Sequence, residues 1–221
     1  MPKLVAEAQQ IQPGLLPPDP AWVLGEGSGL SYLRTYLTVL ADRADGQLGE
    51  LLARAPEKVQ FLQDPRNVGL FEQWQRDDVA KTVTWQSIDI TRDWGLNGFR
   101  DAQGYAYDGI GWYRIVMPVK KPATGRAQLV APLVFAEKLW IWVNGALVYS
   151  PTTPPADPKT GPEPGKAVCV NLRGGMSLAM DIQDYLKPGA ENTFTFRMQG
   201  SLDRAQHRGI ADRPIVWAPK K

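Results

Sequence analysis

The sequence of 221 residues contains one cysteine, one histidine and a formal net charge of only +2. The single Cys169 excludes an internal disulfide and a metal site made of several cysteines. The single His207 excludes a metal site made of several histidines, and no Gly-x-Ser-x-Gly nucleophile motif accompanies it. Lys and Arg are scattered, so we expect no nucleic-acid partner. No apolar run approaches the roughly 20 residues that span a bilayer, so we expect no membrane span.

Aromatic and loop-forming residues are what the sequence has in quantity: eight Trp, seven Tyr, 19 Pro and 21 Gly. This composition favours short strands joined by many loops, as in a sandwich or a barrel. Hydrophobic residues make up 43% of the chain, enough to bury a core. Residues 1–12 lack the basic start and apolar stretch of a secretory signal. The chain is therefore intracellular, a fragment, or a product from which a signal has been removed.

Residues 1–57 are expected to form a proline-rich extended arm followed by helix. Prolines interrupt the first part and forbid a continuous helix there: Pro13, Pro17, Pro18 and Pro20. Leucines spaced by three and four residues then predict one face of a helix: Leu30, Leu33, Leu37 and Leu40. A second short helix is expected at 47–53, ended by Pro56. An amphipathic helix needs a partner, which is either the following domain or another domain or subunit.

From residue 58 to residue 221, strand-like patterns replace helical spacing. Residues 83–90 alternate with period two, as a half-buried strand does. The clearest hairpin joins residues 138–143 to 146–149 through Asn144-Gly145, the pair that a type I′ turn prefers. Further strands are expected at 112–119, 128–135, 168–172, 177–182, 193–198 and 213–217. Short strands without crossover helices predict a mainly β fold, an antiparallel β-sandwich, with the arm and helical segment before it.

Several motifs, in order, resemble the sugar-binding domain of glycoside hydrolase family 2. They are DPRNVG (64–69) with Trp74, Trp85 and Trp94 after it, YDGIGWYR (107–114), LWIWVNG (139–145), DIQDYLKPG (181–189) with TFTFR (193–197), and the stretch from Arg208 to Val216. The resemblance covers roughly residues 58–218. It implies a galactose-binding-like jelly roll and a secreted or periplasmic location. In that family the catalytic carboxylates lie on a separate barrel domain, which this chain is too short to contain, so no catalytic residue is expected.

Sugar binding is the chemistry that remains, because aromatic rings stack on pyranose rings and carboxylates bind hydroxyl groups. The candidates precede the 112–119 strand or lie on the hairpin: Trp94, Tyr105, Tyr107, Asp108, Trp140 and Trp142. In the hairpin, alternation directs the aliphatic residues inward and both Trp outward, where they need either a cover, such as the N-terminal helix, or a ligand. Trp85 and Trp112 are expected in the core. Arg114 is expected to pair with a carboxylate or a carbonyl.

Two functions from different classes fit these observations. The first is a non-catalytic carbohydrate-binding or accessory module of a glycoside hydrolase, with a carbohydrate or a catalytic domain or subunit as partner. The second is a structural assembly protein that uses the jelly roll as a building block and residues 1–57 for self-association. A stand-alone hydrolase with an unrecognised site is a weaker third hypothesis. No cofactor is expected; structural calcium is compatible with such folds, but no cluster of oxygen ligands indicates it.

Overall fold

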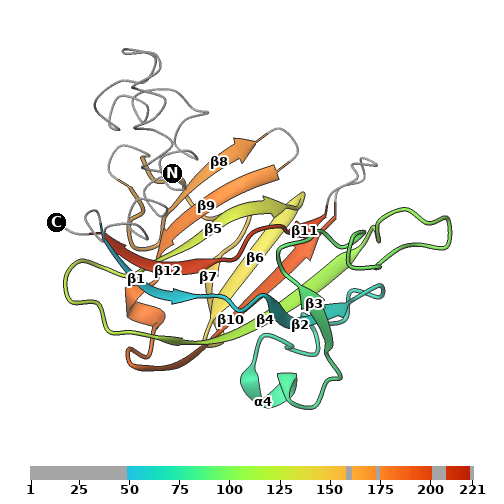
Figure 1. The fold of residues 1–221 in the computed structure, drawn as a ribbon, viewed down its shortest axis with the longest axis horizontal. Helices are drawn as coiled ribbons and strands as arrows, with labels where there is room; N and C mark the ends of the chain where they lie inside the picture. Colours follow the sequence, from blue (N-terminus) through green and yellow to red (C-terminus); the bar gives the residue numbers. More distant parts are fainter. Residues whose placement is uncertain (1–48, 158–160, 173–174, 201–207, 220–221) are drawn as a thin grey trace, which may run out of the picture.

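The computed structural model describes residues 49–157, 161–172, 175–200 and 208–219, which form two antiparallel sheets packed face to face (Figure 1). The first sheet has the order β1 (Gly49–Arg54), β12 (Ile215–Pro219), β5 (Gln128–Phe135), β9 (Gly175–Asp181) and β8 (Ala167–Leu172), with β11 (Gly209–Ile210) paired to β5. The second sheet has the order β3 (Gln86–Asp89), β2 (Lys58–Gln63), β4 (Ile110–Val119), β10 (Ala190–Gln199), β6 (Lys138–Val143) and β7 (Ala146–Tyr149). The antiparallel β-sandwich predicted from the sequence is confirmed.

The main core lies between the sheets and follows from alternation along the strands. In β4, Tyr113 and Ile115 point inward, and in the adjacent β10, Phe194 and Phe196 do the same; all four are fully buried. Burying one large apolar side chain contributes about 1.5–3 kcal/mol, so these paired strands carry much of the stability of the fold. The longest ladder of the molecule is this β4–β10 pair, which extends from Ile110 to Val119.

The Asn144-Gly145 hairpin has the predicted geometry. Both residues have positive φ, 51° and 83°, as a type I′ turn requires. The Asn144 side chain also donates to the Tyr185 carbonyl at 2.8 Å and accepts the Thr193 N–H at 3.1 Å. The turn residue therefore ties β6 and β7 to the 3-10 turn η1 (Gln183–Tyr185) as well as to β10.

The helix predicted at 47–53 is wrong for its described part, which starts at Gly49. Residues 49–54 are strand β1, which pairs with β12 from Gly49 opposite Pro219 to Arg54 opposite Ile215. Leu52 is buried in the core between the sheets, and the bulge between Leu51 and Ala53 shifts the register there. The sandwich thus includes residues 49–54, ahead of Pro56. The arm and the leucine-rich helix expected at 1–46 lie outside the described residues.

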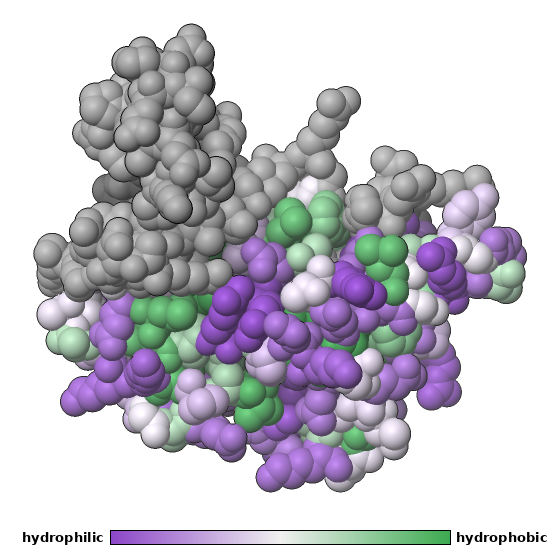
Figure 2. Space-filling model, in the orientation of Figure 1, coloured by the Kyte–Doolittle hydropathy of each residue, from purple (hydrophilic) through white to green (hydrophobic). Residues whose placement is uncertain are grey.

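Residues 64–85 pack on the outer face of the second sheet. They include the short helix α4 (Asp77–Ala80), which lies below β4 in Figure 1. We call these residues the covering segment. Elsewhere polar side chains dominate the described surface on the face in Figure 2, with smaller apolar patches between them. Across the described ranges, no helix is long and apolar enough to cross a membrane.

Candidate functional site

Four of the six candidate residues lie on the loop that joins β3 to β4, residues 90–109, which we call the end loop. It projects from the end of the sandwich where β4 begins (Figure 1). Tyr105 is 58% exposed, Tyr107 is half-buried, and the Asp108 side chain is 44% exposed. Leu96, which is 65% exposed, belongs to the same loop. The loop therefore presents a tyrosine ring, an apolar side chain and a carboxylate to solvent.

The fourth candidate, Trp94, is fully buried and anchors the loop instead. Its indole Nε1 donates to the Tyr113 hydroxyl at 2.6 Å, and its backbone N–H donates to the Arg208 carbonyl. The ring packs against Phe61 at 5.4 Å and against Tyr107 at 5.8 Å between centroids. With no exposed surface, Trp94 has no ring face to offer a sugar, and its part in the site is to support Tyr107.

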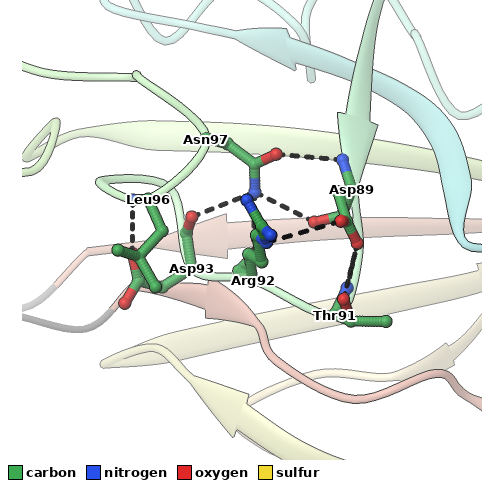
Figure 3. Close-up of polar contacts among 6 residues, drawn as sticks. All are labelled: Asp89, Thr91, Arg92, Asp93, Leu96 and Asn97. Carbon is green, nitrogen blue, oxygen red and sulfur yellow. Dashed lines mark hydrogen bonds and ion pairs between the residues drawn. The ribbon is translucent and has the colours of Figure 1, made fainter.

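Asn97 fixes the first half of the end loop (Figure 3). Its side-chain oxygen accepts the Asp89 N–H at 3.0 Å, and its side-chain nitrogen donates to the carbonyls of Asp89, Arg92 and Asp93 at 2.9–3.0 Å. The Asp93 carboxylate adds a bond from the Leu96 N–H at 2.8 Å. An asparagine that replaces backbone partners in this way holds an irregular loop in one shape.

The second half of the loop is held by Tyr107 and Asp108. The Tyr107 hydroxyl donates to the Ile110 carbonyl at 3.3 Å, and burial raises the pKa of this phenol. The Asp108 carboxylate lies 3.6 Å from the buried guanidinium of Arg208. Close packing leaves no space for a side chain at Gly200, where a Cβ would come within 2.9 Å of Asp108 Oδ1. Asp108 is thus fixed by its charge partner while part of its carboxylate stays accessible.

The two remaining candidates, Trp140 and Trp142, point outward from β6, as the alternation predicts. Trp142 stacks on Trp112 with centroids 5.5 Å apart and an interplanar angle of 18°, and only 6% of it is exposed. Trp140 is half-buried and lies over the Arg197 guanidinium at 4.2 Å. The sequence predicted Trp85 and Trp112 in the core. Trp112 is buried, but on the outer side of the sheet, and Trp85 is only half-buried on that side.

The covering segment supplies what closes over these rings. The Asp64 carboxylate accepts the N–H groups of Val68 and Gly69 and the Trp112 indole N–H, at 2.8, 2.9 and 3.1 Å. Trp74 then packs edge-on against Trp112 at 5.8 Å. Gly69 is needed here because a Cβ would come within 2.7 Å of both indole rings. The covering segment therefore closes over these rings, and it leaves the Trp142 side chain almost no surface for a ligand.

Arg197 is a buried cation of this outer layer. Its Nη2 donates to Asn67 Oδ1 at 2.9 Å, while Nε and Nη1 are buried and have no hydrogen-bond partner among the described residues. Burial lowers the pKa of this guanidinium, as expected for a cation taken out of water. Trp140 provides the ring face that offsets part of this cost. Packing on Arg197 therefore accounts for the position of Trp140 as well as a sugar ligand would.

A groove that the sequence reasoning missed lies beside the covering segment, on the outer face of β2, β3 and β4. Its volume is about 500 Å³, and its lining comprises Pro56, Lys58, Val59, Gln60, Trp85, Gln86, Ser87, Arg114 and Val116. Arg114 meets a carboxylate there, Asp77 at 2.9 Å, as predicted. Alternation in β2, where Lys58 and Gln60 are exposed and Val59 and Phe61 are buried, could have indicated the outer face of the strand but not the groove on it.

In the described ranges, no three His, Cys, Asp or Glu residues lie close enough together to hold a metal ion. His207 lies outside those ranges. Cys169 is exposed as a residue, but neighbouring atoms take part of the solvent from its sulfur, and this partial desolvation raises the pKa of the thiol and disfavours the reactive thiolate.

The fold is similar to part of the β-glucuronidase from Ruminococcus gnavus. Its crystal structure matches with a TM-score of 0.55 and 14% identity, over 79% of this chain and 30% of that one. The same enzyme in complex with D-glucuronic acid gives the same values, and its complex with uronic isofagomine differs only in covering 29% of that chain. No protein-family model and no curated protein matches the sequence. The chain thus shares the sandwich fold of about a third of a glycoside hydrolase.

Proposed function

We propose that this chain is a non-catalytic accessory β-sandwich module that works with a glycoside hydrolase and contacts carbohydrate through the end loop. The observation that carries the proposal is the fold likeness, which covers 79% of this chain but only 30% of the β-glucuronidase. A module of this extent corresponds to one part of such an enzyme. In this proposal the pair of carboxylates that glycoside hydrolysis requires lies on another domain or subunit.

The chemistry of the end loop supports a contact with sugar. Tyr105 offers an exposed aromatic ring, which stacks on the apolar face of a pyranose. Asp108 offers a carboxylate that accepts hydroxyl hydrogen bonds and is held in place by Arg208. Tyr107 and Trp94 fix the loop beneath them. The loop is rigid at its base, so little conformational entropy is lost when a ligand binds.

A glycan array followed by isothermal titration calorimetry tests this contact. Tyr105→Ala is expected to weaken binding of any responding glycan at least tenfold, while Tyr185→Ala, a matched change at another exposed tyrosine, leaves it unchanged. Equal effects of both variants would remove the end loop from the proposal. No response to any glycan would remove carbohydrate binding altogether.

The non-catalytic part of the proposal has its own test. The purified chain is expected to release no chromophore from nitrophenyl glucuronides, galactosides or glucosides. Hydrolysis that co-elutes with the chain in size-exclusion chromatography and survives a further purification step would overturn it.

A second candidate function, a structural assembly protein, is favoured by one observation. Phe71 is 91% exposed and its neighbour Leu70 is 41% exposed, both on the covering segment. A phenylalanine so exposed on a tethered loop suits a contact with another protein surface. Light scattering of the whole chain decides between the two: a monomer at every concentration contradicts assembly, whereas a defined oligomer that Phe71→Ser dissociates supports it.

A further inference from the structure

We propose that the groove on the outer face of β2, β3 and β4 is a second carbohydrate site, and that it takes an acidic oligosaccharide bearing uronic acid carboxylates. This inference rests on the proposed role in carbohydrate contact and adds to it a separate place and a ligand class. The groove has a volume of about 500 Å³, within the range of about 300–1,000 Å³ that is usual for ligand sites.

The floor of the groove is a cross-strand row of polar side chains. Gln60 of β2 lies opposite Ser87 of β3 on one side and opposite Arg114 of β4 on the other. Arg114 donates to Gln60 Oε1 from Nη1 at 2.9 Å and to Asp77 Oδ1 from Nη2 at 2.9 Å. The guanidinium is held from two sides, so the floor keeps its shape before a ligand arrives.

One wall of the groove is Trp85, which follows α4 at the end of the covering segment. Its indole Nε1 donates to the Ala80 carbonyl at 2.8 Å, which fixes the orientation of the ring. The ring packs against the outer Trp cluster of Trp74, Trp112 and Trp142 yet stays half-buried and lines the groove. A fixed indole beside polar groups is an arrangement suited to stacking on a sugar ring.

The polar groups available to a ligand come from β2 and β3. Gln86 and Ser87 line the groove and make no side-chain hydrogen bond within the described part of the chain. The Gln60 amide nitrogen is likewise unused there, because its oxygen is what Arg114 binds. Two amides and a hydroxyl supply both donors and acceptors, the combination that sugar hydroxyl groups need.

The charge of the lining selects the ligand class. Lys58 and Arg114 line the groove and no carboxylate does. Arg114 is matched by Asp77, so Lys58 is the cation left for a ligand. Asp89 stands opposite Lys58 across the β2–β3 pair, but its Oδ1 accepts both Thr91 hydrogen bonds, at 2.6 and 2.9 Å, and its Oδ2 lies 3.6 Å from Arg92 Nε. A carboxylate on the ligand would therefore complete the charge balance of the groove at Lys58.

The probes are trigalacturonic acid, a hyaluronan tetrasaccharide and the methyl ester of trigalacturonic acid, titrated by calorimetry into the whole chain. At least one acidic probe is expected to bind, with an affinity that falls as salt rises and with the ester at least tenfold weaker. Hexaglutamate serves as a non-sugar anion. Binding of hexaglutamate equal to that of the acidic sugars would overturn the inference, because the groove would then attract anions alone.

Two variants place the binding in the groove. Lys58→Gln is expected to weaken the acidic probe at least tenfold without changing the ester, and Lys120→Gln, an exposed lysine away from the groove, changes neither. Trp85→Ala is expected to weaken binding of the acidic probe and of the ester alike, and circular dichroism shows whether this variant keeps its fold. If it does not, the Lys58→Gln result alone tests the groove. An unchanged affinity in Lys58→Gln would refute the groove.

The same set separates this inference from the proposed function. Loss of glycan binding in Tyr105→Ala together with an unaffected Lys58→Gln would overturn the groove and leave the end loop in place. Loss in Lys58→Gln with binding retained in Tyr105→Ala supports the groove as a separate site. Absence of binding by every glycan tested overturns both.

Discussion

Replacing Tyr113 of β4 with phenylalanine tests whether the buried hydrogen bonds beneath the end loop stabilise the fold. The Tyr113 hydroxyl is fully buried and accepts two hydrogen bonds, from Trp94 Nε1 at 2.6 Å and from the Ile210 backbone N–H at 3.2 Å. Tyr113→Phe removes the acceptor and keeps the ring. Two buried donors then lose their partner, and each such loss costs about 1–3 kcal/mol. We therefore expect the free energy of unfolding to fall by about 2–6 kcal/mol.

The measurement is urea denaturation followed by far-ultraviolet circular dichroism, with an unchanged m-value as the sign that the transition stays two-state. Tyr185→Phe, at a partly exposed tyrosine, is the matched control and is expected to change stability by less than about 0.5 kcal/mol. The double variant Trp94→Phe with Tyr113→Phe should lose less than the sum of the two single variants, because one orphaned donor is then absent. A loss below about 0.5 kcal/mol in Tyr113→Phe would refute the reasoning.

Three further predictions concern the loop and the hairpin. Asn97→Ala removes the four hydrogen bonds of Asn97 and is expected to cost about 1–3 kcal/mol and to open the end loop to proteolysis, measured by cleavage rate against wild type. The pKa of Asp89 is lowered, first by the hydrogen bond from the Thr91 hydroxyl. The ionised carboxylate therefore stabilises the fold above the ordinary pKa of about 4, and this stabilisation is lost as the pH falls through the lower pKa of the folded state. Asp89→Asn should flatten the fall of the urea midpoint between about pH 5 and 2. Asn144→Ala is expected to cost about 1–3 kcal/mol and Asn144→Gly less, because only alanine adds strain at a φ of 51°.

The sequence predicted those features of the fold that depend only on residues close together in the chain. The Asn144-Gly145 turn and the inward face of β6 follow from the residues themselves, because φ preferences and period-two alternation need no distant partner. Strand β1 was missed for the opposite reason. Leu51 and Leu52 fit a short helix as well as a strand, and the outcome is set by pairing with β12, more than 160 residues later in the chain.

The site shows the same division. Tyr105, Tyr107 and Asp108 are neighbours in sequence, so the sequence could place them on one loop. It could not tell that Trp94 is buried while Tyr105 is exposed, because burial depends on Phe61 and Tyr113 from other strands. Nor could it find the groove, whose residues come from three strands and the covering segment. Alternation says which residues share a face and leaves open what lies on that face.

The covering segment makes ligand affinity depend on a local opening equilibrium. It is joined to the sheet by Asp64, by the Arg114–Asp77 ion pair and by packing on Trp112, and it also carries the groove wall, Trp85. A local opening of this segment removes the Trp85 wall and leaves the residues of β2, β3 and β4 in place, so the complete groove exists only in the closed fraction. The apparent dissociation constant is the intrinsic one divided by that fraction. A ligand in the groove should therefore slow amide hydrogen exchange in residues 64–85 more than in β4, and warming should weaken binding before the sandwich melts.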